Sequence, residues 1–331
     1  MSFKENLLNK SNSYNYYKET TESLSLENKE LKEIINQLKK DLENKDKNIS
    51  LLKEEIKLLN DKNDHEIEFL DSVSNKINTI LSDSFNRFND YKRITAKNDK
   101  FYRQINNELK YAFVFNDTIK ESEWLIKKDF SLVNSAANYS FMYSLYRILN
   151  DAEPKNILEL GMGQTTKLTS QFANYFNDCK LTVLEGDEIW IENFAEQLVI
   201  SENIHICHMD LENVTIDGTL NTRFKGVLDI VADDKFDLVI IDGPQGFVVE
   251  NGVSKELDYS RSNVLELIPK NLAEDFIIII DDFNRQGEQN TMSIVKELLS
   301  REGIEFYEYS CTGLKRQYVI CTEKYRYVTW I

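Results

Sequence analysis

The first 150 residues of this chain contain no glycine and no proline. All 11 glycines and all three prolines lie in the other 181 residues, and the first of them is Pro154. Glycine and proline are the residues that most readily end helices and build tight turns. Their absence over this length excludes a compact fold with many turns and favours long helices. Since 331 residues suggest about two domains, we expect two parts of different character.

Long apolar runs and paired cysteines are also missing. The longest purely apolar run is Phe276–Ile280, whereas a helix needs roughly 20 apolar residues to span a bilayer. The N-terminal MSFKENLLNK lacks the apolar core of a secretory signal. The four cysteines form no CxxC pair, which speaks against a disulfide framework or a zinc site. The sequence predicts a cytoplasmic protein without a transmembrane segment, which reaches a membrane only through partners.

Positive charge is scarce only in the second part of the chain. Residues 1–150 hold 24 basic and 24 acidic residues, and the rest hold 16 basic and 32 acidic residues, which accounts for the net charge of -16. Nucleic-acid binding relies on lysine and arginine to neutralise phosphates. We therefore expect no nucleic-acid partner.

A heptad repeat runs through residues 24–80. Placing Leu24 at position d makes 13 of the 17 a and d positions aliphatic, with lysine- and glutamate-rich residues between them. This pattern is typical of a coiled coil, and the helix rise per residue predicts a rod of about 85 Å. Isoleucine at a and leucine at d favour a parallel dimer, in which Asn28 and Asn63 at a positions fix the register. The alternatives are a single solvated helix and a disordered charged segment.

Beyond Ile80 the repeat weakens, and aromatic residues predict helices that pack on a globular body. We therefore divide the chain into a coiled-coil oligomerisation rod, residues 1–95, and a domain with N-terminal flanking helices, residues 96–331. In this domain, short apolar runs alternate with amphipathic stretches. The expected strands are Asn156–Leu160, Leu181–Leu184, Ile204–His208, Phe236–Ile241, Phe276–Ile280, Glu305–Tyr309 and Gln317–Thr322. The expected helices are Ala136–Leu149, Thr165–Phe176, Trp190–Ser201 and Thr291–Glu302. This alternation predicts an α/β fold with a Rossmann-like, doubly wound sheet and a ligand site at the carboxyl ends of its strands.

Acidic residues stand where such a sheet binds its ligand. Glu159 precedes a turn that contains Gly161 and Gly163. Acidic residues also end or follow the next four strands, namely Glu185, Asp187, Asp210, Asp242, Asp281 and Asp282. Glycines let the backbone approach a ligand closely, and an acid at the next strand end can bind ribose hydroxyls. The dinucleotide-binding pattern G-x-G-x-x-G needs a third glycine at position 166, where this chain has threonine. Binding of NAD or a nucleotide by a Rossmann-like fold is therefore the alternative and not the first choice.

The order E-L-G-M-G-Q-T-T followed by L-E-G-D resembles the class I S-adenosylmethionine-dependent methyltransferases. Within that class, TVLEGDEIWI at 182–191 and FDLVIIDGPQG at 236–246 look like the glucuronoxylan 4-O-methyltransferases and their polysaccharide-biosynthesis relatives. The Asp281-Asp282 pair also looks like that of metal-dependent sugar O-methyltransferases. The N-terminal rod is a departure from the glucuronoxylan 4-O-methyltransferases of plants, so the resemblance leaves the specific acceptor open.

The resemblance implies a set of residues that holds S-adenosylmethionine. This set is Glu159, Gly161, Gly163, Thr165, Glu185, Asp210 and Asp242. In it, Glu159 and the two glycines embrace the methionine part. Glu185 binds the ribose, and Asp210 lies near the adenine.

Methyl transfer to a hydroxyl requires a base, a metal ion or both to deal with the proton. We expect Asp242, Asp281 and Asp282 to converge on one divalent cation, Mg²⁺ being the first choice because carboxylates suit hard ions. In the alternative, Asp242 is a cofactor or base residue and the other two cap a helix or lie in a loop. The expected catalytic residues are Asp242, Asp282 and Arg261. Arg261 either pairs with a uronate or phosphate of the acceptor or forms an ordinary salt bridge.

The sequence therefore predicts an O-methyltransferase that acts on a cell-surface polysaccharide, as a chain-capping step. The turn Asp242-Gly243-Pro244-Gln245 differs from the Asn/Asp-Pro-Pro-Tyr turn of many N-methylating enzymes, which favours an oxygen acceptor. Expected partners are a glycan or sugar substrate, further copies of the chain through the coil, and a glycan polymerase. The rod then sets a distance, as in bacterial O-antigen chain terminators. The alternatives are a small-molecule O-methyltransferase of the catechol or antibiotic-sugar type, and a non-catalytic scaffold with a vestigial fold.

Overall fold

The computed structural model describes residues 3–59, 65–132, 137–250 and 252–330. The chain divides into two compact units, Met1–Arg103 and Gln104–Ile331. The sequence had placed a boundary between residues 95 and 96. Within the described ranges, no helix has both the length and the apolar character needed to cross a membrane.

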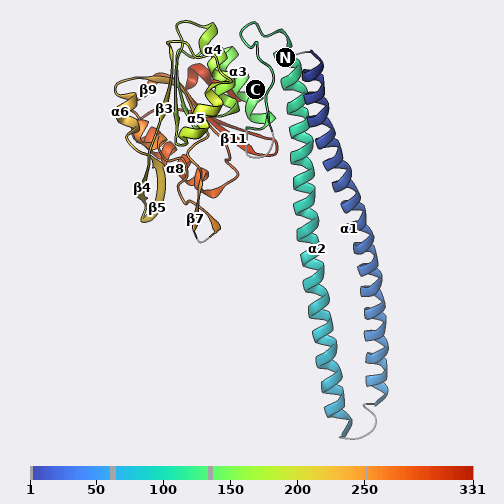
Figure 1. Ribbon diagram of the computed structural model, residues 1–331. Coiled ribbons are helices and arrows are strands. Elements are labelled where there is room, and N and C mark those ends of the chain that lie inside the picture. Colours follow the sequence, from blue (N-terminus) through green and yellow to red (C-terminus); the bar gives the residue numbers. More distant parts are fainter. Residues whose placement is uncertain (1–2, 60–64, 133–136, 251, 331) are drawn as a thin grey trace. The chain divides into compact units, whose positions relative to one another are not determined.

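Two long helices form the first unit. Helix α1 spans Phe3–Leu59, and helix α2 spans His65–Thr118, of which the part up to Arg103 belongs to this unit. Asn28 and Tyr102 line one shared hollow, and residues between Ile35 and Lys45 line another with Ser84–Tyr91. Because rising numbers on α1 meet falling numbers on α2, the helices run antiparallel, as Figure 1 shows.

The predicted long N-terminal helical region is confirmed, but its seam has a different partner. Positions a and d of α1 do form its more buried stripe, and Ile49 and Ile77 are buried. On α1 these positions face α2 of the same chain, however, so the predicted single uninterrupted rod with a parallel partner is corrected to an antiparallel hairpin. In the sequence, asparagine and aspartate, which favour turns over helix interiors, occupy four of the five positions 60–64 between the two helices, and the heptad repeat is interrupted there. Asn63, predicted to fix a parallel register, lies outside the described residues.

A seven-stranded sheet forms the centre of the second unit, in the order β10-β11-β9-β6-β1-β2-β3. The strands are β1 (Asn156–Leu160), β2 (Lys180–Glu185), β3 (Ile204–His208), β6 (Phe236–Ile241), β9 (Leu272–Ile280), β10 (Tyr307–Thr312) and β11 (Arg316–Cys321). Neighbours from β3 to β9 are parallel, and β11 is antiparallel to both β9 and β10. The Rossmann-like, doubly wound α/β sheet predicted from the sequence is confirmed.

Both faces of the sheet are covered because alternate residues of each strand point to opposite sides. Ile277 and Ile279 belong to one core, whereas Ile278 and Ile280 belong to the other. The first core includes side chains from α3 (Tyr139–Ala152), α4 (Gln164–Tyr175), α5 (Glu188–Ala195), the end of α2 and the 3₁₀ helix η2 (Glu323–Trp330). The second includes side chains from α6 (Val227–Val231), α7 (Val264–Leu267) and α8 (Gln286–Arg301). A short 3₁₀ helix, η1 (Ile119–Glu121), follows α2.

Two small hairpins lie outside the sheet, and the sequence did not predict them. One pairs β4 (Leu211–Ile216) with β5 (Thr219–Phe224), and the other pairs β7 (Phe247–Glu250) with β8 (Val253–Glu256). They follow β3 and β6, so both are inserted after carboxyl ends of parallel strands. That is the edge at which sheets of this kind bind ligands.

Candidate functional site

The turn after β1 approaches the backbone of the neighbouring loop very closely. Gly161 has φ +96°, and a Cβ atom there would lie 2.7 Å from the Gly243 nitrogen. A Cβ atom on Gly243 would in turn lie 2.7 Å from the Gly161 Cα. Gly163 differs, because a Cβ atom there meets nothing within 4 Å among the residues that the structure describes. The turn is therefore packed against the loop after β6 on one side and open at Gly163.

Two side chains hold the peptide groups of Met162 in the middle of this turn. Its N–H donates to Glu185 Oε2 (2.7 Å), and its carbonyl accepts from Trp190 Nε1 (2.8 Å). Asp187 caps α5 by accepting from the Trp190 N–H (2.9 Å), which places the indole. Sequence reasoning missed this use of Trp190, although its spacing from Glu185 was part of the family resemblance.

Glu159 lies beneath the turn, fully buried, instead of lining it. Its carboxylate accepts hydrogen bonds from the hydroxyls of Thr166 (2.9 Å) and Thr169 (2.7 Å) on α4. Burial raises the pKa of Glu159 to about 7 even though the threonine hydroxyls favour its charged form. Thr166 also accepts from the Gly163 N–H (2.9 Å), so Glu159 fixes the turn through α4.

The other predicted cofactor residues fall into two groups. Thr165 is buried in the first turn of α4, next to Glu159. Asp210 is exposed after the end of β3, and Glu185 is half-buried at the end of β2. Glu185 Oε1 accepts from the N–H groups of Gly186 (2.7 Å) and Asp187 (3.0 Å). From the residues that the structure describes, Oε2 accepts the one bond from Met162, so it retains capacity for another donor.

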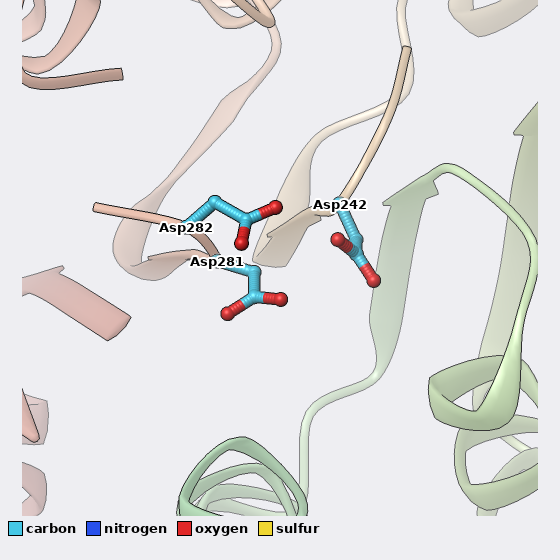
Figure 2. A group of neighbouring side chains, drawn as sticks. All are labelled: Asp242, Asp281 and Asp282. Carbon is cyan, nitrogen blue, oxygen red and sulfur yellow. The ribbon is translucent and has the colours of Figure 1, made fainter. Parts of the chain in front are cut away.

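Three predicted acidic residues come together at the ends of β6 and β9. One carboxylate oxygen each from Asp242, Asp281 and Asp282 lie within 4.8 Å of one another. Figure 2 shows the three side chains together at neighbouring strand ends. The backbone aligns them, since the Asp242 N–H donates to the Leu160 carbonyl (2.7 Å) and the Asp281 N–H to the Ile241 carbonyl (3.0 Å). The parallel ladder thus continues one residue beyond each strand.

Arg261, predicted to be catalytic, lies inside this cluster and is 3% exposed. Its guanidinium pairs with Asp282 Oδ2 (2.7 Å) and Asp242 Oδ1 (3.3 Å) and donates to the Asp281 carbonyl (3.0 Å). Buried Glu288 lies on its other side, with Oε1 3.7 Å from Nε. The arginine therefore serves internal carboxylates, and the predicted pairing with an acceptor uronate or phosphate does not match this position.

Lys315 is the second cation of the cluster, and sequence reasoning missed it. It lies in the turn between β10 and β11, and its Nζ atom is 3.0 Å from Asp281 Oδ2 and 3.5 Å from Asp282 Oδ1. A lysine in a turn ordinarily reads as a solvated surface residue. Only the antiparallel pairing of β11 with β9 brings it to the strand end that carries the aspartates.

Backbone strain coincides with the ion pair of Arg261 and Asp282. Arg261 has φ +57° and Asp282 has φ +56°, which is the left-handed region that residues with a Cβ rarely adopt. Such conformations persist where the surrounding structure enforces them, and they gather at functional sites. Here the two residues in left-handed conformations, Arg261 and Asp282, form one buried salt bridge with each other.

The two aspartates that flank Arg261 have opposite pKa shifts. Burial and the nearby charge of Asp281 raise the pKa of Asp242 to about 7. Burial would also raise the pKa of Asp282, but Arg261, Lys315 and Arg285 together hold it below its ordinary value. The cluster therefore contains one carboxylate that readily takes up a proton and one that does not.

A buried polar chain connects Asp281 to the last turns of α2. Gln317 on β11 donates to Asp281 Oδ1 (2.6 Å) and to Asn138 Oδ1 (2.8 Å). Asn138 donates to Glu108 Oε2 (2.7 Å), which also accepts from the Leu314 N–H (3.0 Å). None of these residues stands in a recognisable motif, so only the fold reveals the connection.

Comparisons with known proteins give likenesses at the level of whole structures only. No family model and no curated protein matches the chain. The chain is similar to the O-methyltransferase TomG from Streptomyces achromogenes, involved in tomaymycin synthesis and solved with SAM: identity is 15%, coverage 66% of this chain and 98% of that one, and the TM-score 0.39. An O-methyltransferase from Bacillus cereus in complex with SAH shows 15% identity and a TM-score of 0.36, with 66% of this chain and 91% of that one covered. A precorrin-6y C5,15-methyltransferase from Geobacter metallireducens shows 12% identity and a TM-score of 0.37, with 59% of this chain and 94% of that one covered. Likeness this weak carries no argument about function, which rests on the residues of the site.

Proposed function

We propose that this chain is an S-adenosylmethionine-dependent O-methyltransferase that acts on a sugar hydroxyl of a cell-surface polysaccharide. The proposal rests on one juxtaposition at the carboxyl edge of the sheet. An open glycine turn, held by Glu185 and Trp190, adjoins the loop that carries Asp242. A turn of this kind suits a nucleoside-containing cofactor, and an aspartate of raised pKa suits removal of a proton from a hydroxyl.

The residues of the turn fit S-adenosylmethionine. Gly163 leaves open space beside the backbone, and Glu185 Oε2 has capacity to accept from a ribose hydroxyl. Asp210 is exposed one strand further along, at the end of β3. When bound there, the cofactor would supply an activated methyl group from its sulfonium for transfer to the acceptor oxygen.

Asp242 is the group that we expect to take the proton of the acceptor hydroxyl. Its Oδ1 atom pairs with Arg261 (3.3 Å), whereas Oδ2 has no hydrogen-bond or ion-pair partner among the described residues. A carboxyl group with a pKa of about 7 is well matched to accept a proton near neutral pH. Arg261 keeps the carboxylate in place while the proton moves to Oδ2.

A sugar acceptor is supported by the resemblance of residues 182–191 and 236–246 to polysaccharide-biosynthesis methyltransferases. The turn that begins at Asp242 also lacks the second proline and the tyrosine typical of many N-methylating enzymes. A small phenolic or antibiotic-sugar acceptor is the second candidate, because the same Asp242 would take its proton.

Calorimetry with S-adenosylmethionine is the first test, and binding is the expected result. Transfer of labelled methyl groups is then measured to a panel of polysaccharides, free sugars and catechols. Asp242→Asn should reduce transfer by about 10²-fold or more while cofactor binding persists. Asp233→Asn, at an exposed residue paired with Lys270, is the control and should change neither quantity.

The outcomes separate the candidates. Label in polymeric glycan only supports the proposal, whereas label in catechol or free antibiotic sugars only replaces it with the small-molecule enzyme. Absence of cofactor binding would leave a scaffold with a vestigial fold.

The helical hairpin of α1 and α2 has a proposed role of its own, as an oligomerisation device and a ruler for glycan length. Leu51 (62% exposed) and Phe85 (65% exposed) leave apolar surface for another copy to cover. A glycan polymerase is the proposed further partner. Removing equal numbers of heptads from both helices should shift the length distribution of the glycan. An unchanged distribution would remove the ruler role and leave the enzyme.

A further inference from the structure

The trio of Asp242, Asp281 and Asp282 is already bridged by cations that belong to the chain. Arg261 lies between Asp242 and Asp282, with nitrogen–oxygen distances of 3.3 and 2.7 Å. Lys315 lies between Asp281 and Asp282, with distances of 3.0 and 3.5 Å. Each positive group thus takes a place between two carboxylates that a metal ion would otherwise take.

An account of the six carboxylate oxygens leads to the same result. Both oxygens of Asp281 are engaged, one by Lys315 and the other by Gln317 Nε2 (2.6 Å). Both oxygens of Asp282 lie within 3.5 Å of a cation, since Oδ2 pairs with Arg261 and Oδ1 with Lys315. Across the described residues, only Oδ2 of Asp242 has no such partner.

This arrangement does not fit a divalent ion. Mg²⁺ requires near-octahedral oxygen ligands at about 2.0–2.1 Å, so the Lys315 ammonium would have to leave its two carboxylates first. Arg261 is held by two backbone carbonyls as well, those of Ile241 (3.3 Å) and Asp281 (3.0 Å), and it is not free to leave. With Arg285 and Glu288 included, adding Mg²⁺ while the side-chain cations stay would also place five positive charges against four carboxylates.

We propose that Lys315 takes the place of the divalent ion, so that methyl transfer at this site needs no metal. The inference rests on the proposed function. Lys315 pairs with Asp281 and Asp282, whose carboxylates lie beside that of Asp242, and its side chain retains 17% exposure. Its role is to stabilise negative charge that develops on the acceptor oxygen as the proton moves to Asp242 Oδ2. A fixed ammonium group in a partly buried site is effective for this purpose.

The test measures Mn²⁺ binding by electron paramagnetic resonance, together with methyl transfer after treatment with a chelator. The wild-type chain should bind no Mn²⁺ at this site at millimolar concentration and should keep its activity in the chelator. Lys315→Met leaves the carboxylates with one cation fewer, so it should bind Mn²⁺ at least tenfold more tightly than wild type and lose most activity. Lys315→Arg should exclude Mn²⁺, as wild type does. Lys270→Met, at an exposed lysine paired with Asp233, is the matched control.

Loss of wild-type activity in the chelator, with recovery on adding Mg²⁺ or Mn²⁺, would overturn the inference. So would a Lys315→Met variant whose Mn²⁺ binding and activity equal those of wild type. If Lys315→Met fails to fold, the wild-type and Lys315→Arg measurements still decide. Cofactor calorimetry is read separately: no binding of S-adenosylmethionine overturns the proposed function and the catalytic role of Lys315, whereas binding leaves the Mn²⁺ result to decide the inference alone.

Discussion

Gly161 and Gly163 stand in one turn, but their surroundings predict different consequences of adding a methyl group. In Gly161→Ala the new Cβ would lie within 2.7–2.9 Å of the backbone at Asp242 and Gly243, at a φ that disfavours alanine. We expect a loss of more than about 2 kcal/mol in the free energy of unfolding. Gly163→Ala meets open space, so stability should change by less than about 1 kcal/mol.

Urea unfolding followed by tryptophan fluorescence measures both variants. All three tryptophans lie in the second unit and therefore report on it. Gly163→Ala should still weaken S-adenosylmethionine binding about tenfold or more, because the methyl group fills space beside the proposed cofactor. Equal stability losses in the two variants would contradict this account of the turn.

Glu159 predicts a dependence of stability on pH. Its folded pKa of about 7 exceeds the ordinary 4.5, so between these values the folded state holds a proton that the unfolded state has released. Stability therefore falls as pH rises through this window. Relative to Glu159→Gln, the wild-type free energy of unfolding should decrease by up to about 3 kcal/mol between pH 5 and pH 8.

Urea unfolding at several pH values checks this, with Glu192→Gln on the exposed side of α5 as the control. The control should follow wild type at every pH. A constant difference between wild type and Glu159→Gln across the range would show that the pKa of Glu159 is not raised in the folded state.

At the same scale, the sequence allowed prediction of the acidic residues but not of the groups that neutralise them. Asp242 and Asp281 each follow a buried apolar strand directly, and parallel strand ends meet at one edge. Lys315 and Gln317 come from a strand that enters the sheet antiparallel, 34 and 36 residues after Asp281. No local pattern indicates that neighbourhood, because it depends on strand order.

Helices α1 and α2 pair along their length, so we predict that a deletion in one must be matched by an equal deletion in the other. The stretch Leu38–Asn44 lies opposite Asn86–Lys92 in the antiparallel pair. Deleting both stretches removes one heptad from each helix and keeps the remaining seam in step. The unfolding temperature of the hairpin should then change by only a few degrees.

Deleting either stretch alone should lower the unfolding temperature more strongly, because one heptad loses its partner and the seam beyond it meets the wrong residues. Circular dichroism of the three full-length variants measures this. Similar unfolding temperatures for the paired and single deletions would show that the two helices do not stabilise each other.

Elements were predictable where one local pattern dominates. Strands Ile204–His208 and Phe236–Ile241 have the predicted bounds, because short apolar runs between polar segments leave few alternatives. The fold-back of the heptad region was missed, since a seven-residue repeat is the same for a partner in another chain and for a partner in its own. The hairpin of β4 and β5 did have a local signal: Asp217 and Gly218, both at positive φ, form its turn.

For the whole molecule, the exposed apolar side chains of the first unit predict self-association. Sedimentation equilibrium of the full chain should give at least twice the monomer mass. Replacing both Leu51 and Phe85 by lysine should shift the equilibrium to the monomer, because charged groups resist burial in an apolar contact. Ile126→Lys, at a side chain 75% exposed in the second unit, is the control and should leave the mass unchanged. A monomeric wild type would remove the proposed oligomer.

The contact between Gly161 and Gly243 has a consequence for how this chain can diverge. A Cβ atom on either glycine would lie 2.7 Å from a backbone atom of the other. Neither position can therefore accept a side chain unless a whole loop moves. We expect the two positions to be inherited together as one unit. The two inserted hairpins lie outside the seven-stranded sheet, so we expect them to vary more freely. Change in these hairpins is thereby separated from change in the turn that we propose holds the cofactor.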